Sequence, residues 1–339
     1  MNATNSSSLE PNRSAAYVYI TFSSILAFFI LAGNVLVILA YGKNHRLQTQ
    51  TNMFIASLAV TDFIVGAVSV PTWVYGTFVD HQENFRGLSE LFGSFDRFSA
   101  LASIFHLTAI SVERSLSITR PFVYEVLSPS VYKCMLIAAW LTAALFTVFF
   151  WLLASLQFRG VATVTIFTVG FVIPSVLMLT VYTGIFRTAR ALIDRTATDR
   201  SEESLRNKVR EERKVAMTVS VVTMLFLMAW LPFFVVSLLA HFCKNCLPKG
   251  DDQIIMVRMV KWLHYLNSAV NPFIYALRDK EMRNSFAKLL CLQRRKKHHK
   301  RQLEYRKNNT MGIEIDVIPQ KKAWIKRTWI VSLQKYIQW

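Results

Sequence analysis

The chain has 339 residues, of which 53% are hydrophobic and 18% are charged, and its formal net charge is +18 at pH 7. This composition is too apolar for an ordinary soluble protein of that length and indicates a membrane protein. A basic excess is also typical of nucleic-acid binding, but the Lys and Arg residues are distributed by predicted membrane side, and we therefore expect no nucleic-acid partner.

Residues 1–16 form a polar segment ahead of the first apolar run. This segment carries three Asn-x-Ser/Thr sequences, at Asn2, Asn5 and Asn12. Such sequences accept N-linked glycans on the extracellular side of a membrane. No cleavable signal peptide is evident, so we expect the first apolar run to direct insertion. The sequence predicts a short, glycosylated extracellular tail.

Seven apolar runs between residues 17 and 277 are each long enough to cross a bilayer as a helix. They span residues 17–40, 53–75, 92–118, 134–156, 161–186, 215–240 and 254–277. Most Lys and Arg residues lie in the alternate connections that would share one membrane side, and after the seventh run. The positive-inside rule then places the N-terminus outside and the C-terminus in the cytoplasm. We predict an all-α, multi-pass plasma-membrane protein, a seven-transmembrane helix bundle over residues 17–277.

The second run contains a carboxylate, Asp62, in the middle of its apolar residues. A charge at that depth is costly to insert, so Asp62 should face the bundle interior and have partners there. A structural polar cluster and an ion or proton site both fit this expectation.

The third run carries charges at its two ends, with Asp96 at one end and the pair Glu113-Arg114 at the other. Asp96 and Arg114 are 18 residues apart, about five helical turns and ~27 Å, so they share one helix face. Arg97 points about 100° away from Asp96 and is a poor partner for it. We therefore expect Asp96 to be paired by a ligand.

Residues 278–291 form an amphipathic segment after the seventh run. Met282, Phe286, Leu289 and Leu290 share one side of this segment, opposite its basic residues. It is expected to be a short interfacial helix, with Cys291 as a palmitoylation candidate. Residues 292–339 form a basic cytoplasmic tail, and its first basic stretch is suited to anionic membrane lipids.

The chain has four cysteines, of which Cys134 and Cys291 are predicted to be cytoplasmic. The remaining pair, Cys243 and Cys246, would lie outside. A Cys-x-x-Cys pair can also be half of a zinc site or a redox motif, but no second Cys or His pair accompanies it on that side. A small disulfide loop is the favoured interpretation.

Each of the seven runs contains a distinctive set of residues, in a fixed order along the chain. The sets are Asn34, Asp62, Glu113-Arg114, Trp140, Pro174 with Tyr182, residues 226–234, and Asn271-Pro272-Phe273-Ile274-Tyr275. This series resembles the rhodopsin-like class of G-protein-coupled receptors, and the pocket motifs resemble those of the biogenic-amine receptors. The resemblance implies a receptor rather than an enzyme. It implies binding of a small cationic ligand from outside and activation of a heterotrimeric G protein inside.

The resemblance also implies which residues bind the ligand. Asp96 would be the counter-ion of an amine, Tyr265 would hydrogen-bond that acid, and aromatic side chains would surround the ligand. The implied set is Asp96, Trp230, Phe233, Phe234, Trp262 and Tyr265. An ammonium held by a carboxylate between aromatic walls gains both a charge-assisted hydrogen bond and cation–π attraction.

A sodium site and a set of residues that change contacts on activation are further implications of the resemblance. The sodium ion, the only cofactor expected, would bind at Asp62, Ser103, Asn267, Ser268 and Asn271, whose oxygen atoms suit a hard cation. In the inactive state Arg114 would pair with Glu113 and Glu212, and Phe122 would contact the G protein. The remaining residues implied to rearrange are Ile104, Pro174, Phe226, Tyr182 and Tyr275.

The chain departs from the family pattern at several positions. Ser89 stands where most relatives have the cysteine of an external disulfide, and Ser115 stands where a tyrosine usually follows the Glu-Arg pair. Ile166, Phe167 and Gly170 stand where catecholamine receptors have serines, which disfavours a catechol ligand.

Two alternative functions stay open. The short outer loops and the missing disulfide also fit a receptor of the same class for a peptide or lipid ligand. An ion-coupled transporter would use Asp62 and Asp96 as an ion path, although no internal repeat supports this. A retinal-binding receptor is excluded because Tyr265 stands where those relatives have lysine.

Overall fold

The computed structural model describes residues 13–79, 86–195 and 203–290, and the regular structure in these ranges is helical throughout. The helices are α1 (Arg13–Lys43), α2 (Gln50–Ile64), α3 (Val70–Val79), α4 (Arg86–Thr119), α5 (Pro121–Val126), α6 (Pro129–Ser155), α7 (Arg159–Thr165), α8 (Ile173–Arg195), α9 (Glu203–Phe242), α10 (Asp251–Arg278) and α11 (Lys280–Leu289). The seven predicted spans correspond to α1, α2 with α3, α4, α6, α7 with α8, α9 and α10.

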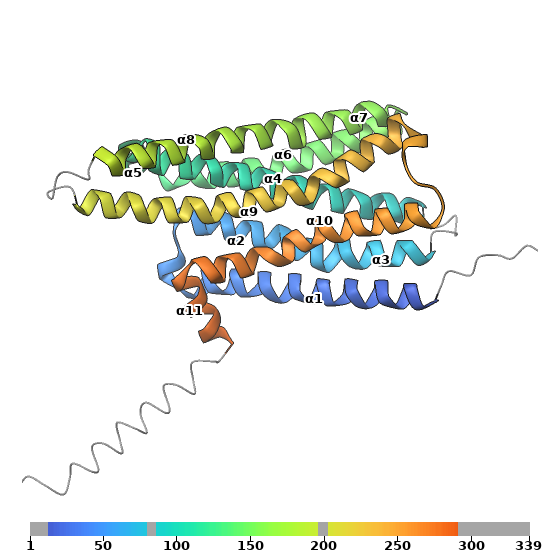
Figure 1. The fold of residues 1–339 in the computed structure, drawn as a ribbon, viewed down its shortest axis with the longest axis horizontal. Coiled ribbons are helices and arrows are strands. Elements are labelled where there is room, and N and C mark those ends of the chain that lie inside the picture. The colour runs from blue at the N-terminus through green and yellow to red at the C-terminus, as the bar shows by residue number, and fades with distance from the viewer. Residues whose placement is uncertain (1–12, 80–85, 196–202, 291–339) are drawn as a thin grey trace, which may run out of the picture. The chain divides into compact units, whose positions relative to one another are not determined.

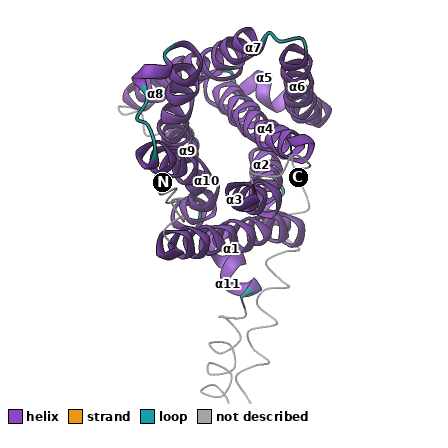
Figure 2. Cartoon of the chain, turned by 90° about the vertical axis from the view of Figure 1, so that its right-hand side faces the viewer, coloured by secondary structure: helices purple, strands orange, loops and turns teal. Residues whose placement is uncertain are grey.

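The long helices lie side by side along a common direction (Figure 1). The predicted third span, α4, packs against α2, α6, α8 and α9. A helix at the edge of the bundle would contact fewer of the other spans. Figure 2 looks along the helices and shows α1 on one side of the bundle and α6, α7 and α8 on the opposite side. The helix that carries Asp96 and Arg114 is therefore the one with access to most of the bundle.

Two spans contain a π-helical turn, at Val65–Ser69 between α2 and α3 and at Ile166–Val172 between α7 and α8. Both spans stay helical through these turns, over Gln50–Gly76 and Arg159–Asp194, but the sequence analysis did not anticipate the change of helix type. Each turn contains a glycine in tight contact, since a Cβ on Gly66 would lie 2.8 Å from Cγ2 of Ile30 and one on Gly170 would lie 2.8 Å from Cδ2 of Leu101. Such turns often occur at functional sites.

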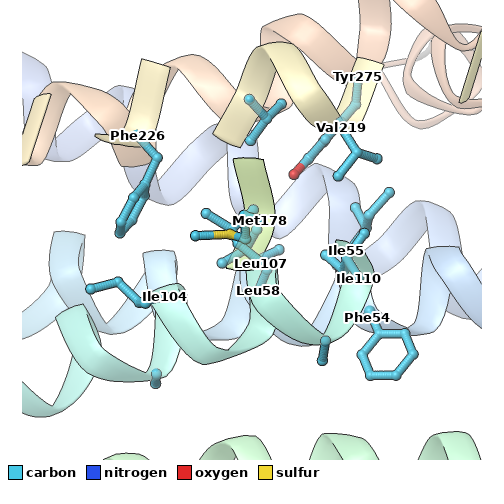
Figure 3. Packing of buried hydrophobic residues seen from close by; sticks show 14 of the residues in the cluster. Phe54, Ile55, Leu58, Ile104, Leu107, Ile110, Met178, Val219, Phe226 and Tyr275 are labelled. Carbon is cyan, nitrogen blue, oxygen red and sulfur yellow. The ribbon is translucent and has the colours of Figure 1, made fainter. Parts of the chain in front are cut away.

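The main hydrophobic core lies between α2, α4, α8, α9 and α10 (Figure 3). The labelled side chains in that figure are Phe54, Ile55, Leu58, Ile104, Leu107, Ile110, Met178, Val219, Phe226 and Tyr275. Burial of this apolar surface fixes the faces that α4 turns toward its neighbours.

The outward faces of the spans are apolar. On α6, for example, Leu141, Leu145, Val148 and Leu152 are exposed at the spacing of one helix face. Five spans are apolar enough to cross a membrane by length and composition, namely α1, α2 with α3, α6, α7 with α8, and α9. The other two, α4 and α10, are long enough but carry the charged residues described below.

The segment predicted as an interfacial helix over residues 278–291 forms α11, Lys280–Leu289. The carboxylate of Asp279 caps it by accepting from the backbone N–H groups of Glu281 and Met282. Met282 is buried, and Asn44 donates to Ser285 Oγ at 2.8 Å, which joins α11 to the end of α1. Cys291 and the tail over residues 292–339 lie outside the described residues.

Candidate functional site

A cavity of about 490 Å³ opens between the helices at the end of the bundle that holds Asp96, which we call the pocket end. Ser69 and Ile166, one from each π-helical turn, line the cavity, so both turns border the site. Its other walls come from α3, α4, α6, α7, α9 and α10. The volume is in the range of known small-molecule sites.

Asp96 is paired within the chain, which corrects the expectation that a ligand is its only partner. Lys261 of α10 donates from Nζ to Asp96 Oδ2, and both side chains are nearly buried, with 10% and 15% of their surfaces exposed. The ammonium also lies 4.9 Å from the ring centroids of Trp73 and Phe233. The position expected for a ligand ammonium therefore holds a lysine ammonium.

The sequence contains a signal for this pair. Lys261 lies four residues before Tyr265 in an apolar run, so the two share one helix face, and a lysine there needs a carboxylate partner. Tyr265 lines the same cavity, and its hydroxyl lies 3.5 Å from the carbonyl oxygen of Ser69.

The structure brings most of the predicted aromatic residues to the cavity. Phe233 and Phe234 line it, and Trp230, which packs against both rings, lines a small pocket that shares Asp96, Phe233 and Phe234 with the cavity. Trp262 is the exception, because its Nε1 donates to Ser23 Oγ at 3.0 Å and its ring stacks on Tyr19. Its inclusion among the ligand-binding residues was wrong, since it faces α1.

The middle of the bundle holds the predicted polar cluster around Asp62. Ser268 Oγ donates to Asp62 Oδ1 at 2.7 Å, and Asn271 Nδ2 donates to Oδ2 at 2.8 Å. Ser103 contacts the residue that precedes Asp62, because its hydroxyl is hydrogen-bonded to Thr61 Oγ1 at 2.9 Å. Asn267 is buried nearby on α10, and the hydrogen bonds of Asp62 come from Ser268 and Asn271 instead. The cluster therefore gathers a carboxylate, hydroxyl groups and a carboxamide group in one buried place.

At the opposite end of the bundle, the Arg114 end, two carboxylates surround the guanidinium. Arg114 bonds Glu113 through Nε and Nη2, and its Nη1 donates to Glu212 Oε2 at 2.7 Å. Tyr124, Ser117 and Thr51 complete this set, which we call the Arg114 cluster. Tyr124 Oη donates to Glu113 at 2.8 Å, Thr51 Oγ1 donates to Glu113 at 3.2 Å, and Ser117 Oγ donates to Glu212 at 2.9 Å. The cluster joins α2, α4, α5 and α9.

Tyr124 and Ser117 were not identified from the sequence. Burial and the neighbouring Glu113 carboxylate raise the pKa of the Tyr124 phenol far above its usual value. The phenol therefore stays protonated and remains a hydrogen-bond donor to Glu113.

Buried residues connect the two ends along α4. Ile104 and Phe226 belong to the core in Figure 3, and Pro174 is buried on α8. Tyr182 Oη accepts from Ser111 Oγ at 3.0 Å, and Tyr275 is buried in the same core. These contacts place the residues implied to rearrange on activation between the pocket and the Arg114 cluster.

The chain matches the family described as "7 transmembrane receptor (rhodopsin family)" over residues 33–275, which is well over half of its length. The chain belongs to this family. The prediction of a seven-helix membrane bundle is confirmed, and the protein is a multi-pass membrane receptor rather than an enzyme.

Three curated proteins illustrate what the receptor is similar to. It is 27% identical over 320 residues to octopamine receptor beta-1R of Drosophila melanogaster, covering 78% of this chain and 60% of that protein. It is 30% identical over 335 residues to the D(1) dopamine receptor of Carassius auratus, covering 84% and 91%. It is 30% identical over 314 residues to the histamine H2 receptor of Cavia porcellus, covering 86% and 85%.

Two of four further predicted features of the receptor fall on described residues. A disulfide joins Cys243 and Cys246 after α9. Phe122 on α5 is 83% exposed near the Arg114 cluster. The glycosylation candidates Asn2, Asn5 and Asn12 and the palmitoylation candidate Cys291 lie outside the described residues.

Proposed function

We propose that the receptor binds a small ligand with a protonated amine in the cavity around Asp96 and activates a heterotrimeric G protein at the Arg114 end. The observation that carries the proposal is the state of Asp96, whose Oδ1 is buried and makes no hydrogen bond within 3.5 Å among the described residues, although the hydroxyls of Ser69 and Tyr265 lie near the carboxylate. This oxygen is an open acceptor in an aromatic-walled cavity, which suits an ammonium donor. The names of the similar octopamine, dopamine and histamine receptors favour an amine over a peptide or lipid ligand.

The proposal includes an orientation in the plasma membrane. The distribution of basic residues favours the pocket end outside and the Arg114 end in the cytoplasm. The exposed Phe122, beside the Arg114 cluster, is then positioned to contact the G protein. The basic residues after α10 face the inner leaflet, where anionic lipids attract them.

The amine site is tested by applying a panel of amine-bearing compounds, monoamines and amino acids included, to cells that express the chain. An active compound should raise cAMP or calcium, and Asp96→Ala should weaken its potency by roughly 30-fold or more, because loss of one partner of a buried charge pair costs about 2–5 kcal/mol. Asp96→Asn, which keeps the shape of the side chain, should lose potency similarly. Antibody labelling of surface receptor is the control, and full potency in both variants at equal surface number would contradict the proposal.

We further propose that the cluster around Asp62 binds a sodium ion that weakens agonist binding. Ser268 and Asn271 hold the carboxylate by hydrogen bonds, and the carboxylate and hydroxyl oxygens of the cluster are ligands that suit a hard monovalent cation.

Agonist affinity should therefore fall several-fold when sodium chloride replaces choline chloride at equal ionic strength, and Asp62→Asn should remove this difference, because coupling free energies are typically 1–3 kcal/mol. Potassium chloride serves as the ion control. Equal agonist affinity of the parent receptor in sodium and choline would count against the site.

A further inference from the structure

The cavity at the pocket end holds more positive than negative charge. Asp96, Arg97 and Lys261 all line it, and Asp96 already carries the Lys261 ammonium on one oxygen. A lysine ammonium has three N–H donors, so the bond to Asp96 leaves others for a second acceptor. The empty cavity thus has one carboxylate for two cations.

Arg97 is held in place by groups that do not neutralise it. Its Nη2 donates to Ser94 Oγ at 2.9 Å, and its guanidinium lies 4.3 Å over the ring of Phe150. The nearby carboxylate of Glu90 pairs instead with Arg159, at 3.1 Å. Within residues 13–79, 86–195 and 203–290, no carboxylate lies at ion-pair distance from Arg97.

Four buried polar atoms of the cavity wall make no hydrogen bond within 3.5 Å in the described part of the chain, although the Ser69 hydroxyl lies near the Asp96 carboxylate. They are Asp96 Oδ1, Ser69 Oγ, Trp73 Nε1 and Arg97 Nε. The first is an acceptor, the last two are donors, and the hydroxyl is either. Buried polar groups are normally satisfied, so this set indicates a ligand that offers both a donor and an acceptor.

A ligand whose only polar group is an amine supplies the donor but not the acceptor. It can donate to Asp96 Oδ1, but it adds a third cation beside Arg97 and Lys261 and leaves the Trp73 and Arg97 donors unused. A ligand that also carries a carboxylate leaves the net charge of the cavity unchanged. That carboxylate accepts from the same donors and from the Lys261 ammonium.

We propose that the physiological ligand class is the zwitterionic aromatic α-amino acid, or a close relative with the same amine and carboxylate. The amine binds Asp96, the carboxylate binds Lys261 and Arg97, and the aromatic side chain packs on Phe233 and Phe234. The proposal rests on the amine site proposed above and specifies its ligand.

The test uses pairs of compounds that differ only by one carboxylate: phenylalanine and phenethylamine, tyrosine and tyramine, tryptophan and tryptamine. Responses are recorded in amino-acid-free buffer from cells expressing the full chain, with untransfected cells as background. The amino acid of at least one pair should act at a concentration about tenfold or more below that of its amine, the equivalent of one additional charge-assisted bond.

Three variants assign the preference to the cationic residues. Lys261→Met removes the ammonium at similar side-chain length, and it should weaken the amino acid about tenfold or more while strengthening the amine, because Asp96 then lacks a cation. Lys261→Arg retains the charge and should retain the preference. Arg97→Gln leaves the Asp96–Lys261 pair intact and should weaken the amino acid but not the amine, so the result does not depend on Lys261→Met folding.

The outcomes distinguish failure of the zwitterion proposal from failure of the amine-site proposal. If amines act through Asp96 more potently than the amino acids, and neither Lys261→Met nor Arg97→Gln changes that ratio, the amine site stands and the zwitterion proposal is wrong. Lys261 would then be an internal counter-ion that amines displace. If neither member of any pair acts on surface-expressed parent or Lys261→Met receptor, the zwitterion proposal is wrong, and the wider amine panel described above decides the amine site.

Discussion

Replacing Glu212 with glutamine is expected to raise signalling without agonist about five- to thirtyfold. Arg114 and Ser117 of α4 both donate to Glu212 of α9, at 2.7 and 2.9 Å, and the family resemblance implies that this closed arrangement is inactive. A hydrogen bond to a charged group contributes about 1.5–3 kcal/mol, and the partial exposure of Glu212 lowers that to roughly 1–2 kcal/mol. A free-energy change of that size is a factor of about 5–30 in the equilibrium between the two states.

The measurement is nucleotide exchange on a G protein in membranes, with no ligand added and the rate divided by receptor number. Glu211→Gln is the matched control, because Glu211 is the adjacent acid but pairs with Lys214 on an exposed face of α9. Exposed pairs of this kind contribute about 0–1 kcal/mol. Equal ligand-independent rates in both variants would show that the Glu212 contacts do not hold the helices closed.

Glu113→Ala is expected to produce the largest loss of stability, about 3–5 kcal/mol, the typical cost of removing one partner from a buried ion pair. Glu113 is fully buried and accepts from Arg114, from Tyr124 at 2.8 Å and from Thr51 at 3.2 Å. Without it Glu212 is the carboxylate that the buried guanidinium keeps, and the hydroxyls of Thr51 and Tyr124 lose Glu113 as their acceptor.

Thermal unfolding of the detergent-solubilised receptor measures this loss. Glu90→Gln is the comparison, since it breaks the ion pair with Arg159 at the pocket end, where the two side chains are 57% and 64% exposed. That pair should contribute no more than about 1 kcal/mol. Similar midpoints for Glu113→Ala and Glu90→Gln would mean that burial of the Arg114 cluster does not stabilise the fold as argued.

The positions of the spans could be predicted from the sequence because each is a long apolar run. The run at 92–118 became α4, Arg86–Thr119, and the run at 254–277 became α10, Asp251–Arg278. The π-helical turns could not be predicted from the sequence. Gly66 and Gly170 lie in these turns, and they are closely approached by Ile30 and Leu101 of neighbouring helices. Those contacts are known only once the helices are packed.

The candidate site was predictable where the resemblance supplied both partners. Asp62 with Asn271 and Arg114 with Glu212 lie together as expected. The pocket was predicted less well. The resemblance implied that a ligand is the partner of Asp96, so Lys261 was not considered as that partner.

The prediction that Trp262 is a ligand-binding residue failed for a related reason. Neighbouring residues on a helix point about 100° apart, so with Lys261 directed at Asp96, Trp262 is turned toward α1.

The Asp96–Lys261 pair also bears on how the chain is made. Each residue is unfavourable to insert into a membrane alone, by about 2.5–3.5 kcal/mol at a helix centre and less near the ends. Asp96 lies on the third span to be synthesised and Lys261 on the seventh, so the carboxylate has no cation from α10 until the last span enters the bilayer. Insertion of α10 is thus the event that pairs the Asp96 carboxylate, and chains that stop before α10 lack the cation that Lys261 provides.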